Sequence, residues 1–167
     1  TRRSSDLGYD MVTEGLLPWY AANRRDLPWR KSREPYAVWV SEIMLQQTRV
    51  EAVIPYYRRF MQALPDVRAL ADAPEEQLLK LWEGLGYYSR VRNMQAAAGQ
   101  IVKRGGFPQT AEELKKLKGF GDYTAGAVAS IAFAQRAAAV DGNVLRVWTR
   151  MERVGESIKI PSVKRAC

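Results

Sequence analysis

Two acidic residues lie in surroundings that suit catalysis, and the first is Glu42 in the run VWVSEIMLQQT (38–48). No basic residue occurs between Arg33 and Arg49, and most neighbours of Glu42 are apolar. Because burial raises the pKa of a carboxyl group, such an acid can hold a proton near neutral pH and act as a general acid. The alternative is an ordinary glutamate in a helix–helix interface, hydrogen-bonded to a backbone group or to Gln46, about 40° away around the helix.

The second acid is Asp141 in the run VDGNV (140–144). Apolar or small residues precede it and Gly142 and Asn143 follow, which places an acid at the exit of a buried helix. An aspartate in this position is also an ordinary helix N-cap, and the sequence leaves both interpretations open.

Between these two acids, the run LKGFGDYTAGAV (117–128) places Gly-x-Gly between two expected helices. Glycine permits a tight hairpin with left-handed φ, and the following helix presents free N–H groups to a phosphate. The pattern is typical of a helix–hairpin–helix that binds the DNA backbone, although plain turns between helices also contain glycine. The nearby Lys115, Lys116 and Lys118 favour phosphate binding.

The sequence has no histidine, and its single cysteine is the last residue, Cys167. These counts exclude Ser-His-Asp and Cys-His catalysis and imidazole metal sites. They also exclude a disulfide, a zinc knuckle or an iron–sulfur cluster built within this chain, so we expect no metal site. Acid–base chemistry is left to carboxylates, Tyr or Lys.

The charge balance points to a polyanionic partner. Lys and Arg outnumber Asp and Glu by 26 to 18, a net charge of +8, which favours nucleic acid over the alternative of a merely solvated basic surface. No apolar stretch is long enough to span a membrane, and the N-terminal residues lack the apolar region of a secretory signal. We therefore expect no membrane partner.

The elements that must position these residues are helices. The 167 residues, 47% of them hydrophobic, suffice for one core or two small lobes. We expect an all-α fold, with capping boxes at Thr48-x-x-Glu51 and Thr110-x-x-Glu113, a cap at Asp66 and a stop at Gly105. The expected helices lie at about 9–24, 36–47, 48–63, 67–72, 74–82, 88–103, 123–134 and 142–153, with a short one after Thr110.

Four motifs, in this order and spacing, resemble the adenine DNA glycosylases of the MutY type, members of the endonuclease III-like helix–hairpin–helix superfamily. They are VWVSEIMLQQT, GLGYYSRVRN (84–93), LKGFGDYTAGA and VDGNV, and the resemblance extends from about Leu27 to Val154. It implies a six-helix barrel domain over 28–140 that contains the helix–hairpin–helix (114–128). Residues 1–27 and 141–167 are then parts of an incomplete second helical lobe, truncated before the iron–sulfur loop and the C-terminal 8-oxoguanine-recognition domain.

The resemblance also implies roles for the two acids. Glu42 matches the acid that protonates the adenine ring, and Asp141 matches the carboxylate that stabilises the oxocarbenium-like sugar before water attacks. Two carboxylates with opposite duties are the logic of glycoside hydrolysis. Asn143 matches the residue that orients the aspartate, and Tyr123 stands where strand-cleaving relatives carry their Schiff-base lysine.

The resemblance implies a second group of residues that contact the substrate DNA. Leu45 and Gln47 match residues that push into the duplex, and Tyr87 matches an aromatic residue that intercalates beside 8-oxoguanine. These insertions offset the free-energy cost of extruding a base. Others surround the adenine pocket or bind phosphate at the hairpin, although Trp29 also suits a core and the two arginines a solvated surface. The group comprises Leu45, Gln47, Tyr87, Arg25, Trp29, Arg30, Lys118, Gly119 and Gly121.

Two departures from the family pattern concern the hairpin and the cofactor. Lys118 replaces the usual proline of the hairpin, which loosens the turn but adds positive charge. The four cluster cysteines of the family would lie beyond Cys167, so we expect no cofactor in this chain, and a 4Fe–4S cluster only if those cysteines follow. The chain is then either a fragment or a cluster-free member, and a monovalent cation at the hairpin is a further expectation.

The resemblance predicts a monofunctional DNA glycosylase of base excision repair that removes adenine mispaired with 8-oxoguanine or G. Its partner would be double-stranded DNA with such mismatches, and we expect a monomer. We expect an intracellular location, in the bacterial cytoplasm or in a eukaryotic nucleus or mitochondrion. The alternatives are a bifunctional glycosylase and lyase for oxidised pyrimidines, which the lack of lysine at position 123 disfavours, and a non-catalytic helix–hairpin–helix DNA-binding module.

Overall fold

The computed structural model describes residues 4–151, and within that range it contains helices and no strand. The all-α prediction is therefore confirmed. The helices are α1 (Ser4–Asn23), a 3-10 helix η1 (Pro28–Arg30), α2 (Pro35–Leu45), α3 (Val50–Ala63), α4 (Val67–Asp72), α5 (Glu75–Trp82), α6 (Ser89–Arg104), α7 (Ala111–Leu114), α8 (Asp122–Phe133) and α9 (Gly142–Met151). Within the described residues, no helix is both long and apolar enough to cross a bilayer.

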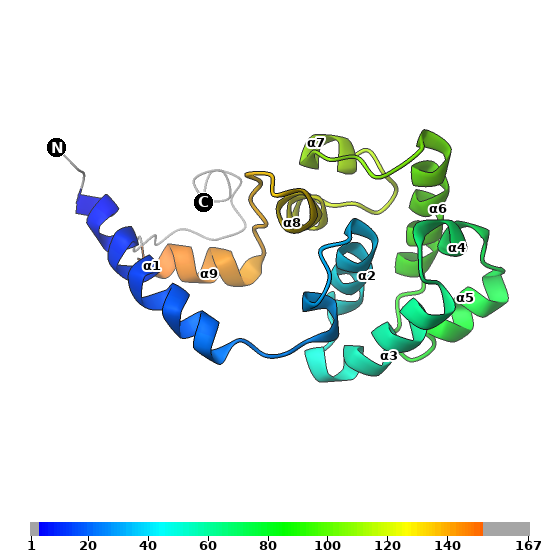
Figure 1. Ribbon diagram of the computed structural model, residues 1–167, viewed down its shortest axis with the longest axis horizontal. Coiled ribbons are helices and arrows are strands. Elements are labelled where there is room, and N and C mark those ends of the chain that lie inside the picture. The colour runs from blue at the N-terminus through cyan, green and yellow to red at the C-terminus, as the bar shows by residue number, and fades with distance from the viewer. Residues whose placement is uncertain (1–3, 152–167) are drawn as a thin grey trace.

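Helix α2 lies at the centre of the molecule, between α8 and α3 (Figure 1). Eight of its eleven residues are buried, and its run of apolar side chains is what a helix covered on most sides requires. Trp39 stacks on Phe120 with 5.1 Å between ring centroids, which fixes α2 against the turn before α8. Glu42 is the one acid on this helix, so its position follows from the packing of α2.

The hydrophobic core lies within α2–α8 and the segment just before them. Its largest fully buried side chains are Trp39, Trp82 and Phe60, and the last two meet edge to face at 6.1 Å. Helix α4 packs against α6 and α7 against α8, whereas α1 and α9 lie on the opposite side of the molecule from α4–α6 (Figure 1). The two-lobe division at residues 28 and 140 remains a prediction.

Three of the expected helix ends are confirmed by their hydrogen bonds. Asp66 accepts from the Ala69 N–H at 2.8 Å, and Thr110 accepts from the Glu113 N–H at 3.3 Å. Gly105 ends α6 in the left-handed conformation, with φ 89°.

The capping box at Thr48 was a wrong prediction. Helix α3 begins at Val50 with Arg49 as its N-cap, and the Thr48 hydroxyl instead donates to the Gln46 carbonyl at 3.4 Å. Glu51, the expected partner in the box, pairs with Arg25 at 2.8 Å. Helix α2 also ends at Leu45, two residues earlier than expected. The last two residues of the expected helix 142–153 lie outside the described residues.

Candidate active site

Glu42 and Tyr123 meet where α2 packs against α8. Burial raises the pKa of the Glu42 carboxyl group, and the charge of Asp141 raises it further. The Tyr123 hydroxyl lies close enough to the carboxylate to lower that pKa as a hydrogen-bond donor, and the net shift is upward. Burial, followed by the Glu42 charge, also raises the pKa of Tyr123, so its phenol stays neutral. The pair therefore combines a carboxyl group whose pKa is raised with a neutral phenol.

Asp141 reaches this site from the start of α9, where it is the N-cap. Its Oδ1 accepts from the backbone N–H of Asn143 at 2.9 Å and of Val144 at 2.8 Å. Its Oδ2 accepts from the Asn143 side-chain amide at 3.1 Å, and Arg146 in turn donates to the Asn143 side-chain oxygen. The N-cap interpretation is thus confirmed, and the same three bonds hold the carboxylate in one orientation.

Gln46 is not the partner of Glu42. Its side-chain amide donates to the Thr124 hydroxyl at 3.3 Å, so the amide ties the end of α2 to the first turn of α8. The alternative in which Glu42 bonds to Gln46 is therefore wrong. Thr124 is buried next to Tyr123, and sequence analysis missed it because its partner lies 78 residues away.

Two exposed side chains with left-handed backbones lie near the ends of adjacent elements. Gln47 follows α2 with φ 59°, and Tyr87 precedes α6 with φ 48° and 67% of its surface exposed. Leu45 is only partly exposed and packs against the core. Non-glycine residues rarely adopt this backbone region, so both projecting side chains are held in place by their surroundings.

The three residues matched to the adenine pocket lie in different environments. Trp29 is 8% exposed and meets Tyr57 edge to face at 5.5 Å, which makes it a core residue as well as a pocket candidate. Arg25 is exposed and pairs with Glu51. Arg30 donates to the Arg25 carbonyl at 3.0 Å and lies over the ring of Tyr20.

The hairpin between α7 and α8 takes its left-handed residue at Gly119, with φ 76°. A Cβ there would lie 2.9 Å from the Asn93 Cβ, so glycine is required on both counts. Gly121 is instead extended at φ −84° and serves as the N-cap of α8, so the expectation of left-handed φ does not hold for it. The exposed Lys118 donates its backbone N–H to the Gln100 side chain at 3.0 Å.

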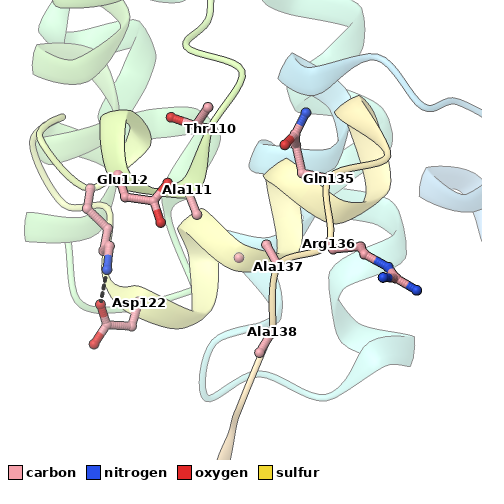
Figure 2. Close-up of a pocket in the computed structure, with 10 residues that line it drawn as sticks. Thr110, Ala111, Glu112, Asp122, Gln135, Arg136, Ala137 and Ala138 are labelled. Carbon is pink, nitrogen blue, oxygen red and sulfur yellow. Dashed lines mark ion pairs between the residues drawn. The ribbon is translucent and has the colours of Figure 1, made fainter.

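A pocket of about 420 Å³ lies between the first turns of α7 and α8 and the residues that follow α8 (Figure 2). Lys115 and Asp122 form an ion pair in it at 3.2 Å. None of the predicted site residues lines this pocket. One wall of the pocket, from Gln135 to Ala138, belongs to the connector that leads from α8 towards Asp141. Neither Glu42 nor Asp141 lines the pocket.

Gly126 lets that connector approach α8. A Cβ at Gly126 would collide with the carbonyl oxygen of Ala138, so only glycine fits between them. The signal in the sequence was the small-residue run Ala125-Gly126-Ala127, which sequence analysis left without a role.

Metal and cofactor ligands are scarce. Within the described residues no group of three or more His, Cys, Asp or Glu side chains could hold a metal ion. A 4Fe–4S cluster takes four thiolates, and the chain has one cysteine, so its residues do not fit that cofactor.

The sequence matches the family described as HhH-GPD superfamily base excision DNA repair protein over residues 40–167. It is similar to proteins named adenine DNA glycosylase, with 52% identity to that of Rattus norvegicus over 84% of this chain. Identity is 45% to that of Arabidopsis thaliana over 89% of this chain, and 45% to that of Buchnera aphidicola subsp. Baizongia pistaciae over 81%. The chain spans 28–39% of the length of these relatives.

Two solved structures resemble the fold. A thermostable thymine-DNA glycosylase has a TM-score of 0.80 and 27% identity, over 87% of this chain and 68% of that chain. A non-covalent endonuclease III–DNA complex has a TM-score of 0.77 and 24% identity, over 95% of this chain and 74% of that chain. The endonuclease III-like architecture expected from the sequence is thereby confirmed.

Proposed function

Because the chain belongs to the HhH-GPD superfamily of base excision DNA repair proteins, we propose that it is a monofunctional glycosylase that hydrolyses adenine from DNA. The observation that carries the proposal is the Glu42–Tyr123 pair beside the charge of Asp141. It provides one carboxyl group with a raised pKa and a second carboxylate nearby, as glycoside hydrolysis requires.

Glu42 is the proton donor in this proposal. Adenine is a poor leaving group until a ring nitrogen is protonated, and a partly buried acid with a raised pKa can supply that proton. The bond that breaks joins the sugar to the base, and its electron pair leaves with the protonated base.

Asp141 stabilises the positive sugar that remains. Three hydrogen bonds from Asn143 and Val144 fix the orientation of its carboxylate, so it need not reorganise as charge develops. A water molecule then adds to the sugar carbon and loses a proton, which leaves an abasic site and free adenine.

Tyr123 explains why the reaction should stop at the abasic site. A lyase step needs an amine that forms a Schiff base with the sugar, and a phenol with a raised pKa cannot do this. Tyr123 instead lies beside Glu42 and remains neutral. The bifunctional alternative is therefore disfavoured.

We further propose that the substrate is double-stranded DNA with adenine opposite 8-oxoguanine or G, bound by a monomer. The net charge of +8 suits a polyanion, and the exposed side chains of Gln47 and Tyr87 would enter the base stack. Lys118, Gly119 and the N-terminus of α8 would bind the DNA backbone, and Arg25, Trp29 and Arg30 would border the extruded base. Such a substrate requires a compartment that contains DNA.

Incubation of excess protein with duplexes that carry 8-oxoguanine:A, G:A, 8-oxoguanine:C or T:A tests the proposal. We expect adenine release from the first two duplexes, and strand breakage only after alkali treatment. Breakage without alkali would favour the lyase alternative. Salt-dependent binding of all four duplexes without an abasic product would favour the DNA-binding module.

A further inference from the structure

Arg90, in the first turn of α6, binds two separate segments of the chain at once. Its Nη1 donates to the carbonyl oxygens of Ile43 at 2.9 Å and Gln46 at 2.6 Å, at the end of α2. Its Nη2 donates to those of Leu85 at 3.0 Å and Gly86 at 3.3 Å, in the loop before α6. A planar guanidinium can make such a bridge, whereas an ammonium group cannot reproduce its geometry.

Two of these four carbonyl groups belong to the peptide bonds that lead into the left-handed residues. Gln46 immediately precedes Gln47 at φ 59°, and Gly86 immediately precedes Tyr87 at φ 48°. Apart from Ala134, these are the non-glycine residues with positive φ among the described part of the chain. One side chain therefore fixes the peptide that sets the direction of each projecting residue.

The Arg90 guanidinium is a partly buried charge without a carboxylate partner among the described residues. It lies over the rings of Trp82 at 5.3 Å and Tyr87 at 5.8 Å. Within the part of the chain that the structure describes, it forms no ion pair with a carboxylate, and its Nε–H is buried without a hydrogen-bond partner. Burying a charge without a counter-ion lowers the free energy of unfolding, so stability by itself does not account for Arg90. This points to a role in positioning the two segments.

We propose that Arg90 is a positioning residue that locks the Gln47 and Tyr87 segments at one fixed separation, so that both side chains enter the duplex together. This inference rests on the proposed function, because it assigns those two side chains to DNA insertion. Arg90 itself does not touch the reacting base. It acts by removing the freedom of two loops that would otherwise be ordered at the moment of binding.

The first test needs no DNA. Hydrogen–deuterium exchange is measured on the full-length protein and its Arg90→Lys variant. Lysine keeps the positive charge but lacks the two guanidinium nitrogens that bind the two segments. We expect exchange about tenfold faster in both segments, 44–49 and 84–89, and unchanged elsewhere. Arg92→Lys is the matched control, since Arg92 lies on the same helix, is exposed and, among the described residues, pairs with Glu75 alone. Unchanged protection in either segment, or faster exchange throughout with a lower unfolding temperature, would overturn the proposal.

The second test uses a duplex with an abasic-site analogue opposite 8-oxoguanine and 2-aminopurine beside it, whose fluorescence rises on unstacking. At saturating protein we expect a several-fold smaller rise with Arg90→Lys than with wild type or Arg92→Lys. An equal rise, or no rise with wild type, would overturn the proposal. Neither test requires base release, so a protein that passes both but frees no adenine would disprove only the proposed function.

Discussion

The hydroxyl of Tyr123 on α8 lies beside the carboxylate of Glu42 on α2, and each side chain shifts the pKa of the other. As a hydrogen-bond donor the hydroxyl opposes the effect of burial, because it favours the ionised carboxylate whereas burial favours the protonated one. The net shift of the Glu42 pKa is upward, and the charge of Asp141 contributes to it. Two helices that are far apart in the sequence thus set the pKa of one acid.

Replacement of Tyr123 by Phe should move the pH dependence of base release to higher pH. The substitution removes the hydroxyl that lowers the pKa of Glu42 and leaves the burial that raises it, so the acid keeps its proton to higher pH. Single-turnover rates across pH on an 8-oxoguanine:A duplex measure the shift, with Tyr88→Phe as control. A falling limb that stays in place or moves to lower pH would contradict the assignment of Tyr123.

Replacement of Asn143 by Ala should slow base release without weakening the fold. The two backbone N–H bonds that make Asp141 an N-cap remain, whereas its Oδ2 loses the amide donor at 3.1 Å. Loss of one hydrogen bond to a charged group corresponds to roughly a 10–100-fold lower rate. Rates and unfolding temperature are compared with those of Asn23→Ala, because the exposed Asn23 amide donates to the Trp19 carbonyl within α1. An unchanged rate would show that Asp141 does not need this orientation.

Replacement of Gly126 by Ala should destabilise the protein and impair base release together. The new methyl group meets the Ala138 carbonyl, so the connector that leads to Asp141 must shift. Overpacking of this kind costs about 1–3 kcal/mol in the free energy of unfolding. Gly99→Ala, in α6, is the matched control, because a Cβ at Gly99 would meet nothing within 4 Å. Since alanine favours a helix more than glycine does, this variant should be slightly more stable than wild type. Urea unfolding measures the stability of both variants. Equal stability would contradict the close approach of the connector to α8 at Gly126.

Local signals in the sequence predicted the features that depend on a few neighbouring residues. Asp66, Thr110 and Gly105 each end or begin a helix by bonds within their own turn, so their roles followed from residue type and spacing. The acid in an apolar run was also visible, because the apolar neighbours of Glu42 are the residues that bury α2.

Features that depend on distant contacts were not predicted. The capping box predicted at Thr48 does not form, because helix α2 ends just before Gln46. The Gln46 carbonyl accepts a hydrogen bond from Arg90, which lies 44 residues away in the sequence. Tyr123 lies beside Glu42, and the Gln46 amide donates to the Thr124 hydroxyl, because the first turn of α8 brings both hydroxyls to this end of α2. Helical spacing places residues on one face of a helix, but only packing decides what that face meets.

The most direct test of this account is the single-turnover rate of adenine release from an 8-oxoguanine:A duplex by Glu42→Gln. Removal of the proton donor should lower the rate about 10²–10⁴-fold, whereas the exposed Glu76→Gln should match wild type. Because burial raises the pKa of Glu42, its ionisation costs stability as the pH rises through that pKa, so the glutamine variant should unfold at no lower a temperature at high pH. Base release by Glu42→Gln within about threefold of wild type would contradict the assignment of Glu42 as the acid.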